Sequence, residues 1–155
     1  MQTSEYVEYK IIADSMMIDN NYEGAIELYT KSITLNENNY QALSNRSTAY
    51  IKLGDYDSAL TDSIKCIKLN PESGKMWGKT GAILCGLERY DSAYNAYVKA
   101  NNLEPNLKYK TMIAELFALT LNINKQDELN INKQDDLNIN NQYSFFGNII
   151  KNIFG

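Results

Sequence analysis

Cysteine, the carboxylates and lysine are the side chains of this 155-residue chain that could carry out chemistry, because the sequence contains no histidine. Histidine is the commonest general base, proton shuttle and zinc ligand, so its absence removes the usual starting point for catalysis. The acidic residues are scattered, no nucleophile pairs with a base, and no phosphate loop or cluster of metal ligands occurs. We therefore expect a protein that is not an enzyme and that uses no cofactor or metal.

Net charge and the number of cysteines further limit the partners and the cellular compartment that we expect. The formal net charge is −4 and no basic run offsets it, so nucleic acid is not an expected partner. Cys66 and Cys85 are too few for a disulfide framework, which fits a reducing, cytosolic or nuclear setting, and we expect the cytoplasm. Residues 1–10 are polar and acidic, unlike a signal peptide, and no run of 18 apolar residues could span a membrane.

The positions of these side chains are set by a 34-residue unit that occurs three times, over about 6–39, 40–73 and 74–107. Aromatic, small and apolar residues recur in register: Tyr22, Tyr56 and Tyr90; Ala25, Ala59 and Ala93; Leu35, Leu69 and Leu103; Ala13, Ser47 and Gly81. A fixed period of this length is the signature of a repeat solenoid.

Each unit contains two stretches with apolar residues at helical spacing, which predict a pair of helices. The six helices are expected at 6–18, 22–35, 40–52, 56–69, 74–86 and 90–103. A seventh amphipathic stretch, 107–121, would cap the last pair, and its apolar residues are Leu107, Met112, Ile113, Leu116, Phe117 and Leu119. The fold class is therefore all-α, with residues 1–121 as one domain whose hairpins bury their apolar faces by stacking.

The composition changes after residue 121. Residues 122–142 are rich in asparagine and repeat every eight residues, which predicts a low-complexity, mostly disordered linker, with slight helical continuation left open. Residues 143–155 form a short apolar amphipathic tail on an otherwise flexible end. This tail could fold back onto the protein, bind a partner or rest on a membrane surface, and membrane contact is the least favoured of the three.

The 34-residue unit resembles the tetratricopeptide repeat. In the third unit the matching pattern of large, small, aromatic and proline positions is Trp77, Gly81, Leu84, Ala93, Tyr97 and Pro105, and in the second it is Leu43, Ser47, Tyr50, Ala59, Ser63 and Pro71. The first unit has Tyr9, Ala13, Met16, Ala25 and Tyr29, with Glu37 in place of proline. The resemblance implies a right-handed superhelical solenoid in which small residues let helices approach and aromatic residues such as Trp77 fill the core.

A narrower resemblance is to three-repeat co-chaperone domains of the Hsp-organising protein and small glutamine-rich tetratricopeptide protein type. In that family a carboxylate clamp holds the acidic C-terminal tail of cytosolic heat-shock chaperones. The resemblance implies that Lys10, Asn45 and Lys75 belong to such a clamp, with Lys79 where arginine is usual and Asp14 where asparagine is expected. The upstream part of the peptide would contact Met17, Thr48, Ile51 and Ala82.

The residue types suit this role, with one contradiction. Lys75 and Lys79 are one helical turn apart and so face the same way. Asp14 lies one turn after Lys10, where its charge would oppose a ligand carboxylate unless Lys10 pairs with it. Gly78 and Gly86 weaken their helix, and close approach of a ligand or a neighbouring helix would explain them.

The sequence thus predicts a protein-binding adaptor, co-chaperone-like, whose concave groove takes the acidic C-terminal peptide of a heat-shock chaperone. The alternative is a general scaffold with a degenerate clamp that binds another partner segment, with self-regulation by the tail at 143–155. An enzyme is the weakest of the alternatives.

Overall fold

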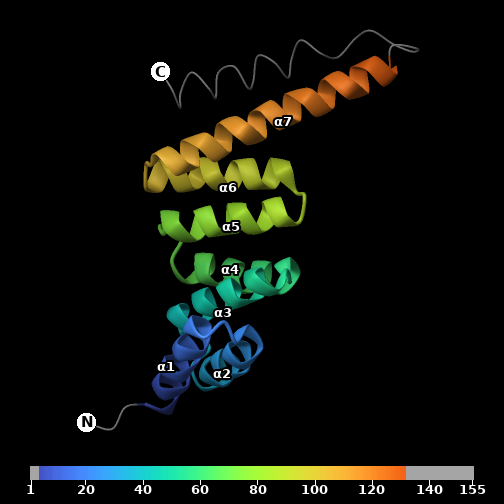
Figure 1. Cartoon of the computed structure of the whole chain (residues 1–155). Coiled ribbons are helices and arrows are strands. Elements are labelled where there is room, and N and C mark those ends of the chain that lie inside the picture. Colours follow the sequence, from blue (N-terminus) through green and yellow to red (C-terminus); the bar gives the residue numbers. More distant parts are fainter. Residues whose placement is uncertain (1–3, 132–155) are drawn as a thin grey trace. The chain divides into compact units, whose positions relative to one another are not determined.

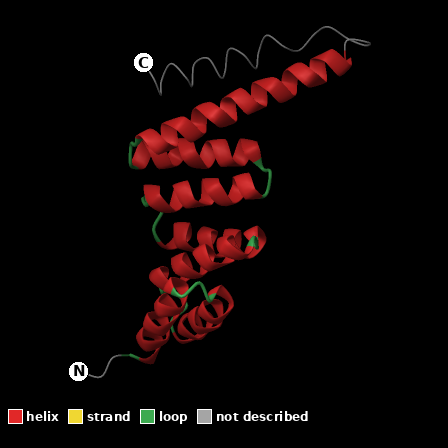
Figure 2. Cartoon of the chain, viewed as in Figure 1, coloured by secondary structure: helices red, strands yellow, loops and turns green. Residues whose placement is uncertain are grey.

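The computed structural model describes residues 4–131, which form helices and connecting loops and contain no strand (Figure 2). The helices are α1 (Glu5–Ile18), α2 (Tyr22–Leu35), α3 (Tyr40–Leu53), α4 (Tyr56–Leu69), α5 (Gly74–Gly86), α6 (Tyr90–Leu103) and α7 (Leu107–Ile131). The three predicted hairpins are confirmed, with boundaries within a residue of those expected. Residues 132–155, which include the predicted tail, lie outside the described part of the chain.

The chain divides into two compact units at Thr120 and Leu121, and the repeats fill the first unit. Within it, α1 packs on α2, α3 on α4 and α5 on α6, while α2 also contacts α3 and α4 contacts α5 (Figure 1). Each hairpin therefore packs against the next, as a solenoid requires. The handedness of the superhelix stays a prediction.

Polar residues at the loops start most of these helices at fixed places. The side chains of Asn21, Asn39, Asp55 and Ser73 each accept a hydrogen bond from a backbone N–H in the first turn of the helix that follows. Such N-caps satisfy donors that have no partner inside the helix, typically stabilising it by about 1 kcal/mol. Gly54 ends α3 in the left-handed conformation, at φ 77°, which glycine adopts without a steric penalty.

Small residues lie where the two helices of each hairpin cross. Ala13, Ala25, Ser47 and Ala59 have no exposed surface, and the Ser47 hydroxyl donates to the carbonyl of Ala59 at 3.0 Å. Tyr97 packs its ring within about 3.0 Å of where a side chain on Gly81 would begin. The predicted role of these positions as points of close approach is confirmed.

Tyrosine rings cover the two glycines that the sequence left unexplained. A Cβ added at Gly78 would lie 2.4 Å from the Tyr109 ring, and one at Gly86 would lie 2.5 Å from the Tyr56 ring. Both approaches come from neighbouring helices, so packing within the protein accounts for these glycines. Trp77 is only half-buried, contrary to its expected place in the core, and its indole N–H donates to the carbonyl of Pro71 at 2.8 Å.

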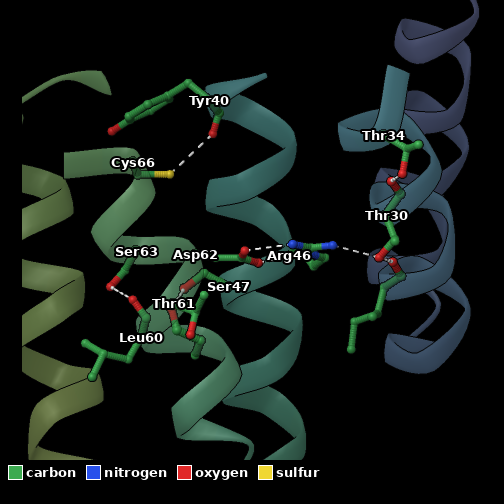
Figure 3. A network of polar contacts seen from close by, with 12 residues as sticks. Thr30, Thr34, Tyr40, Arg46, Ser47, Leu60, Thr61, Asp62, Ser63 and Cys66 are labelled. Atoms are coloured by element: carbon green, nitrogen blue, oxygen red, sulfur yellow. Dashed lines mark hydrogen bonds and ion pairs between the residues drawn. The ribbon is translucent and has the colours of Figure 1, made fainter. Parts of the chain in front are cut away.

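A buried ion pair joins the two helices of the second hairpin, and a further hydrogen bond from its arginine reaches the first hairpin (Figure 3). Arg46 of α3 donates to both carboxylate oxygens of Asp62 on α4, at 2.8 and 2.7 Å, and its third bond reaches the hydroxyl of Thr30 on α2. The side chains of Arg46 and Asp62 are only 16% and 4% exposed. Because a buried charge is costly without a partner, this pair ties α2, α3 and α4 to one arrangement.

Helix α7 differs from its predicted form in length and in its buried face. It ends at Ile131, whereas the sequence predicted its end near residue 121 and a disordered linker beyond. Leu107 and Leu119 were expected to pack, yet they are 79% and 38% exposed, while Tyr109, which was not singled out, is buried. The ring centroids of Tyr109 and Tyr97 lie 6.2 Å apart, so the start of α7 packs on α6.

None of the helices described here is long and apolar enough to cross a membrane.

Candidate functional site

The first helix of each hairpin meets its counterpart in the next, and this brings most of the predicted binding residues onto one face. Asn45 of α3 donates from its side-chain amide to Asp14 of α1 at 2.8 Å. Lys79 of α5 donates to the hydroxyl of Thr48 on α3, also at 2.8 Å. These direct bonds show that α1, α3 and α5 lie side by side in that order.

Asp14 is the centre of the first half of this face. Its Oδ2 accepts from the Lys10 ammonium at 2.7 Å, and its Oδ1 accepts from the Tyr29 hydroxyl at 2.6 Å and from the Asn45 amide at 2.8 Å. Burial opposes ionisation of the Asp14 carboxyl, but the donors outweigh it, so the pKa of Asp14 lies below its ordinary value. The pairing of Lys10 with Asp14 that the sequence suggested is confirmed.

The ammonium group of Lys79 is engaged by α3. It donates to the backbone carbonyl of Ser44 at 2.8 Å, to the Ser44 hydroxyl at 2.9 Å and to the Thr48 hydroxyl at 2.8 Å. An ammonium has three N–H donors, so these bonds use all of them. Burial lowers the pKa of Lys79, and the nearby charge of Lys75 lowers it further. Lys79 is therefore a bridge between two repeats as well as a positive charge on this face.

Lys75 and Ala82 lie at the edge of a cavity of about 800 Å³ between α5, α6 and the start of α7. The stem of Lys79 lines the same cavity, and so do Lys108 and Met112. Lys75 and Lys79 thus line one cavity, and the Lys79 ammonium is bound to Ser44 and Thr48 of α3. That the two ammonium groups face the same way stays a prediction. A cavity of this size is within the range of about 300–1,000 Å³ that is usual for ligand pockets.

The two remaining predicted residues are placed differently. Met17 packs against the hydrophobic core formed by the first two hairpins and Met76 of α5. Ile51 is half-buried near the end of α3 and does not line the cavity between α5, α6 and α7. Their contact with a peptide stays a prediction.

Sequence reasoning missed three members of this face. Tyr29 appeared only as a packing aromatic, Ser44 was not considered, and Lys108 belongs to a helix treated as a cap. The sequence gives a partial signal for Ser44, because Ser44 directly precedes Asn45 on the helix that lines the face. Nothing in the sequence alone places Lys108 beside Lys75.

A second cavity, of about 630 Å³, lies by the Arg46–Asp62 pair at α2, α3 and α4. Ile64, Lys65 and Lys68 of α4 also line it. Ile64 is 42% exposed, so this cavity combines an apolar surface with two lysines. It does not involve the predicted clamp residues.

Metal-ligating side chains and thiols are the remaining groups among residues 4–131 that could do chemistry. No cluster of three or more metal-ligating side chains forms there. Cys66 is fully buried, and burial raises the pKa of its thiol to about 11, so it stays a thiol at neutral pH. Ser32 and Ala100, which occupy the same repeat position as Cys66, are also fully buried, which confirms a packing role there.

Comparison with known proteins identifies the repeat directly. The sequence profile of the tetratricopeptide repeat matches residues 28–61. The chain is 37% identical over 109 residues to the heat shock protein sti1 homolog of Schizosaccharomyces pombe, covering 70% of this chain and 17% of that protein. It is 34% identical over 99 residues to small glutamine-rich tetratricopeptide repeat-containing protein 2 of Mycosarcoma maydis, covering 64% of this chain and 28% of the relative. The chain therefore spans less than a third of these two curated relatives.

Solved structures agree with this. The second TPR domain of human RPAP3, determined in complex with the HSP70 peptide SGPTIEEVD, has a TM-score of 0.68 and 26% identity, covering 72% of this chain and 94% of that one. The Sgt2 TPR domain from Aspergillus fumigatus has a TM-score of 0.67 and 25% identity, covering 88% of this chain and 89% of that one. With three hairpins of the 34-residue period and a repeat match over residues 28–61, the described part of the chain is similar to the tetratricopeptide repeat domains of these proteins.

Proposed function

We propose that this domain is a co-chaperone-like adaptor that binds the acidic C-terminal peptide of a heat-shock chaperone. The face built by α1, α3 and α5 is the binding surface, and the peptide's terminal carboxylate sits close to Lys10 and Asn45. Relatives of the sti1 type and the peptide complex of RPAP3 support this choice of partner.

One observation carries the proposal: Lys10 and Asn45 already hold a carboxylate. That carboxylate belongs to Asp14, which stands in for the ligand's own, with donor distances of 2.7 and 2.8 Å. These are the lengths of strong charge-assisted hydrogen bonds. The same donors suit a peptide carboxylate, and Asp14 competes with it, so binding is weaker than with a neutral residue at position 14.

The test is a titration of a Glu-Glu-Val-Asp peptide into the full chain, followed by fluorescence anisotropy or calorimetry. We expect a dissociation constant in the micromolar range that rises with salt, because lysines supply much of the attraction. Amidating the peptide's C-terminus and the substitution Lys75→Ala should each weaken binding. If neither change matters, or if no binding is seen, the adaptor proposal is rejected.

The alternative is a general repeat scaffold that binds an internal partner segment. Two observations favour it: the Lys79 ammonium is already satisfied by α3, and a second cavity lies beside α4 at Ile64 and Lys65. Indifference of binding to amidation of the bait would favour this reading. If the tail at 143–155 regulates the site, removal of residues 132–155 should raise peptide affinity.

A cytoplasmic location belongs to the same proposal. Cys66 and Cys85 are both free thiols, which suits a reducing compartment.

A further inference from the structure

The cavity between α5, α6 and α7 gathers positive charge without a carboxylate in its lining. It measures about 800 Å³ and is lined by Lys75, Gly78, Lys79, Ala82, Tyr97, Asn106, Lys108, Tyr109 and Met112. Three lysines from two helices therefore surround one space. An anionic group inside it would lie close to several positive charges, and opposite charges attract most where water is partly excluded.

Two of these lysines are available to a ligand. Lys79 turns its ammonium toward Ser44 and Thr48 of α3, where all three donors are used. Lys75 and Lys108 are both exposed, and the structure of residues 4–131 gives neither ammonium an ion pair or hydrogen bond. The backbone N–H of Lys75 donates to Glu104 at 3.2 Å, so a carboxylate already rests against the rim of this region.

The rest of the lining is apolar or fixed. Tyr97, Tyr109 and Met112 form its walls, with the two rings 6.2 Å apart between centroids. Asn106 is not free to rearrange, because its side chain caps α7 by accepting from the Tyr109 N–H at 3.0 Å. Exposed lysines beside apolar lining residues fit a peptide segment in which acidic residues stand next to an apolar one.

We propose that this cavity binds the acidic residues that precede the C-terminus of the ligand, with Lys75 and Lys108 as their donors. Helix α7 then contributes directly to recognition through Lys108, in addition to its packing through Tyr109. The inference rests on the proposed function and deepens it, because it assigns different parts of the ligand to two different binding sites on the domain. The terminal carboxylate lies near Lys10 and Asn45, and the upstream acidic side chains lie between α5 and α7.

The experiment compares two peptides and two matched variants of the full chain. The peptides are Met-Glu-Glu-Val-Asp and Met-Gln-Gln-Val-Asp, which share a terminus and differ only in the upstream charges. The variants are Lys108→Ala and Lys110→Ala, which remove one lysine each from the same turn region of α7. Lys110 is the control because it does not line the cavity.

We expect Lys108→Ala to weaken binding of the Glu-Glu peptide about 5-fold, the size of an exposed ion pair. The same variant should leave binding of the Gln-Gln peptide unchanged, and Lys110→Ala should alter neither. The inference is overturned if Lys108→Ala binds both peptides like the unmodified chain, or if Lys110→Ala has the same effect as Lys108→Ala. In those cases, peptide binding by the unmodified chain still supports the proposal that the domain is an adaptor. If the unmodified chain binds neither peptide, both the adaptor proposal and the cavity inference are overturned.

Discussion

Replacing Asp14 by asparagine should raise the affinity for acidic C-terminal peptides. Asp14 holds a full negative charge among the donors that a ligand carboxylate needs, with Lys10 at 2.7 Å and Asn45 at 2.8 Å. Asparagine keeps an oxygen that can accept from the Tyr29 hydroxyl, removes the charge, and frees Lys10 for the ligand. The substitution therefore separates the electrostatic effect of residue 14 from its place in the packing.

The size of the effect follows from the geometry. Two acceptors that share the Asn45 amide, each about 2.9 Å from the nitrogen, lie roughly 5 Å apart. Two negative charges at that separation repel by about 3 kcal/mol at an effective dielectric constant near 20, and by less than about 1 kcal/mol in bulk water. The Asp14 side chain is 34% exposed and is paired with Lys10, so we expect a gain of about 1–2 kcal/mol, or roughly 5- to 30-fold in affinity.

The assay is a titration of a Glu-Glu-Val-Asp peptide into the unmodified chain and into Asp14→Asn at two salt concentrations. Asp57→Asn is the matched control, because Asp57 is exposed on α4 and its loss changes the net charge equally. The gain should be larger for Asp14→Asn than for Asp57→Asn and should shrink at high salt. A weaker complex for Asp14→Asn, with helix content unchanged, would refute the placement of the ligand carboxylate beside Asn45.

Three further predictions concern stability. Arg46→Ala should lower the free energy of unfolding by about 3–5 kcal/mol in urea titrations, because it leaves Asp62 buried without its partner. Gly78→Ala should destabilise the domain by about 1–3 kcal/mol in thermal unfolding, because its new methyl group meets the Tyr109 ring at 2.4 Å. When the pH is lowered, the unmodified chain should lose more stability than the Asp14→Asn variant does, because the pKa of Asp14 in the folded chain is depressed. That contribution is complete above the unfolded pKa of about 3.9 and is lost as the pH falls through the folded value.

Each of these predictions has a contrasting outcome. Lys31→Ala, which removes an exposed pair with Glu27 on α2, should leave the urea midpoint nearly unchanged, so equal losses for Lys31→Ala and Arg46→Ala would contradict the reasoning. If Gly78→Ala were stabilising, the gain in helix propensity would outweigh the contact with Tyr109. Parallel stability profiles of the unmodified chain and Asp14→Asn below pH 5 would show that Asp14 is not linked to folding.

The sequence was sufficient to predict the repeats and the helices that carry them. The period of 34 residues aligns each small position with a crossing point, and Ala13, Ser47 and Gly81 all lie at such points. Helix boundaries followed from turn residues, since Gly54 and the capping side chain of Asp55 mark one loop unambiguously. These features are local or periodic, and so they can be read directly from residue order.

The partners of individual side chains were less predictable. Lys79 bonds to Ser44, 35 residues earlier, and Arg46 bonds to Asp62, 16 residues later. Such contacts depend on how one helix is rotated against another, which the apolar pattern does not specify. The pairing of Lys10 with Asp14 was predictable because both lie on one helix, whereas the bond from Tyr29 to the same carboxylate was not.

The sequence predicts the end of α7 near residue 121, with slight helical continuation left open, whereas the helix extends to Ile131. Residues beyond 121 contain many asparagines, which favour turns and disorder, but also lysine, glutamine and glutamate, which favour helix. A helix that is already started by the packing of Tyr109 and Ile113 extends at little cost, since nucleation is the expensive step.

The tyrosine rings over Gly78 and Gly86 make the third hairpin specific to its position in the array. Gly86 receives Tyr56 from the hairpin before it, and Gly78 receives Tyr109 from the helix after it. The three units share a period, but the third hairpin has specific contacts with both of its neighbours. Duplicating this hairpin, or exchanging it with another hairpin, would therefore leave a gap or a clash.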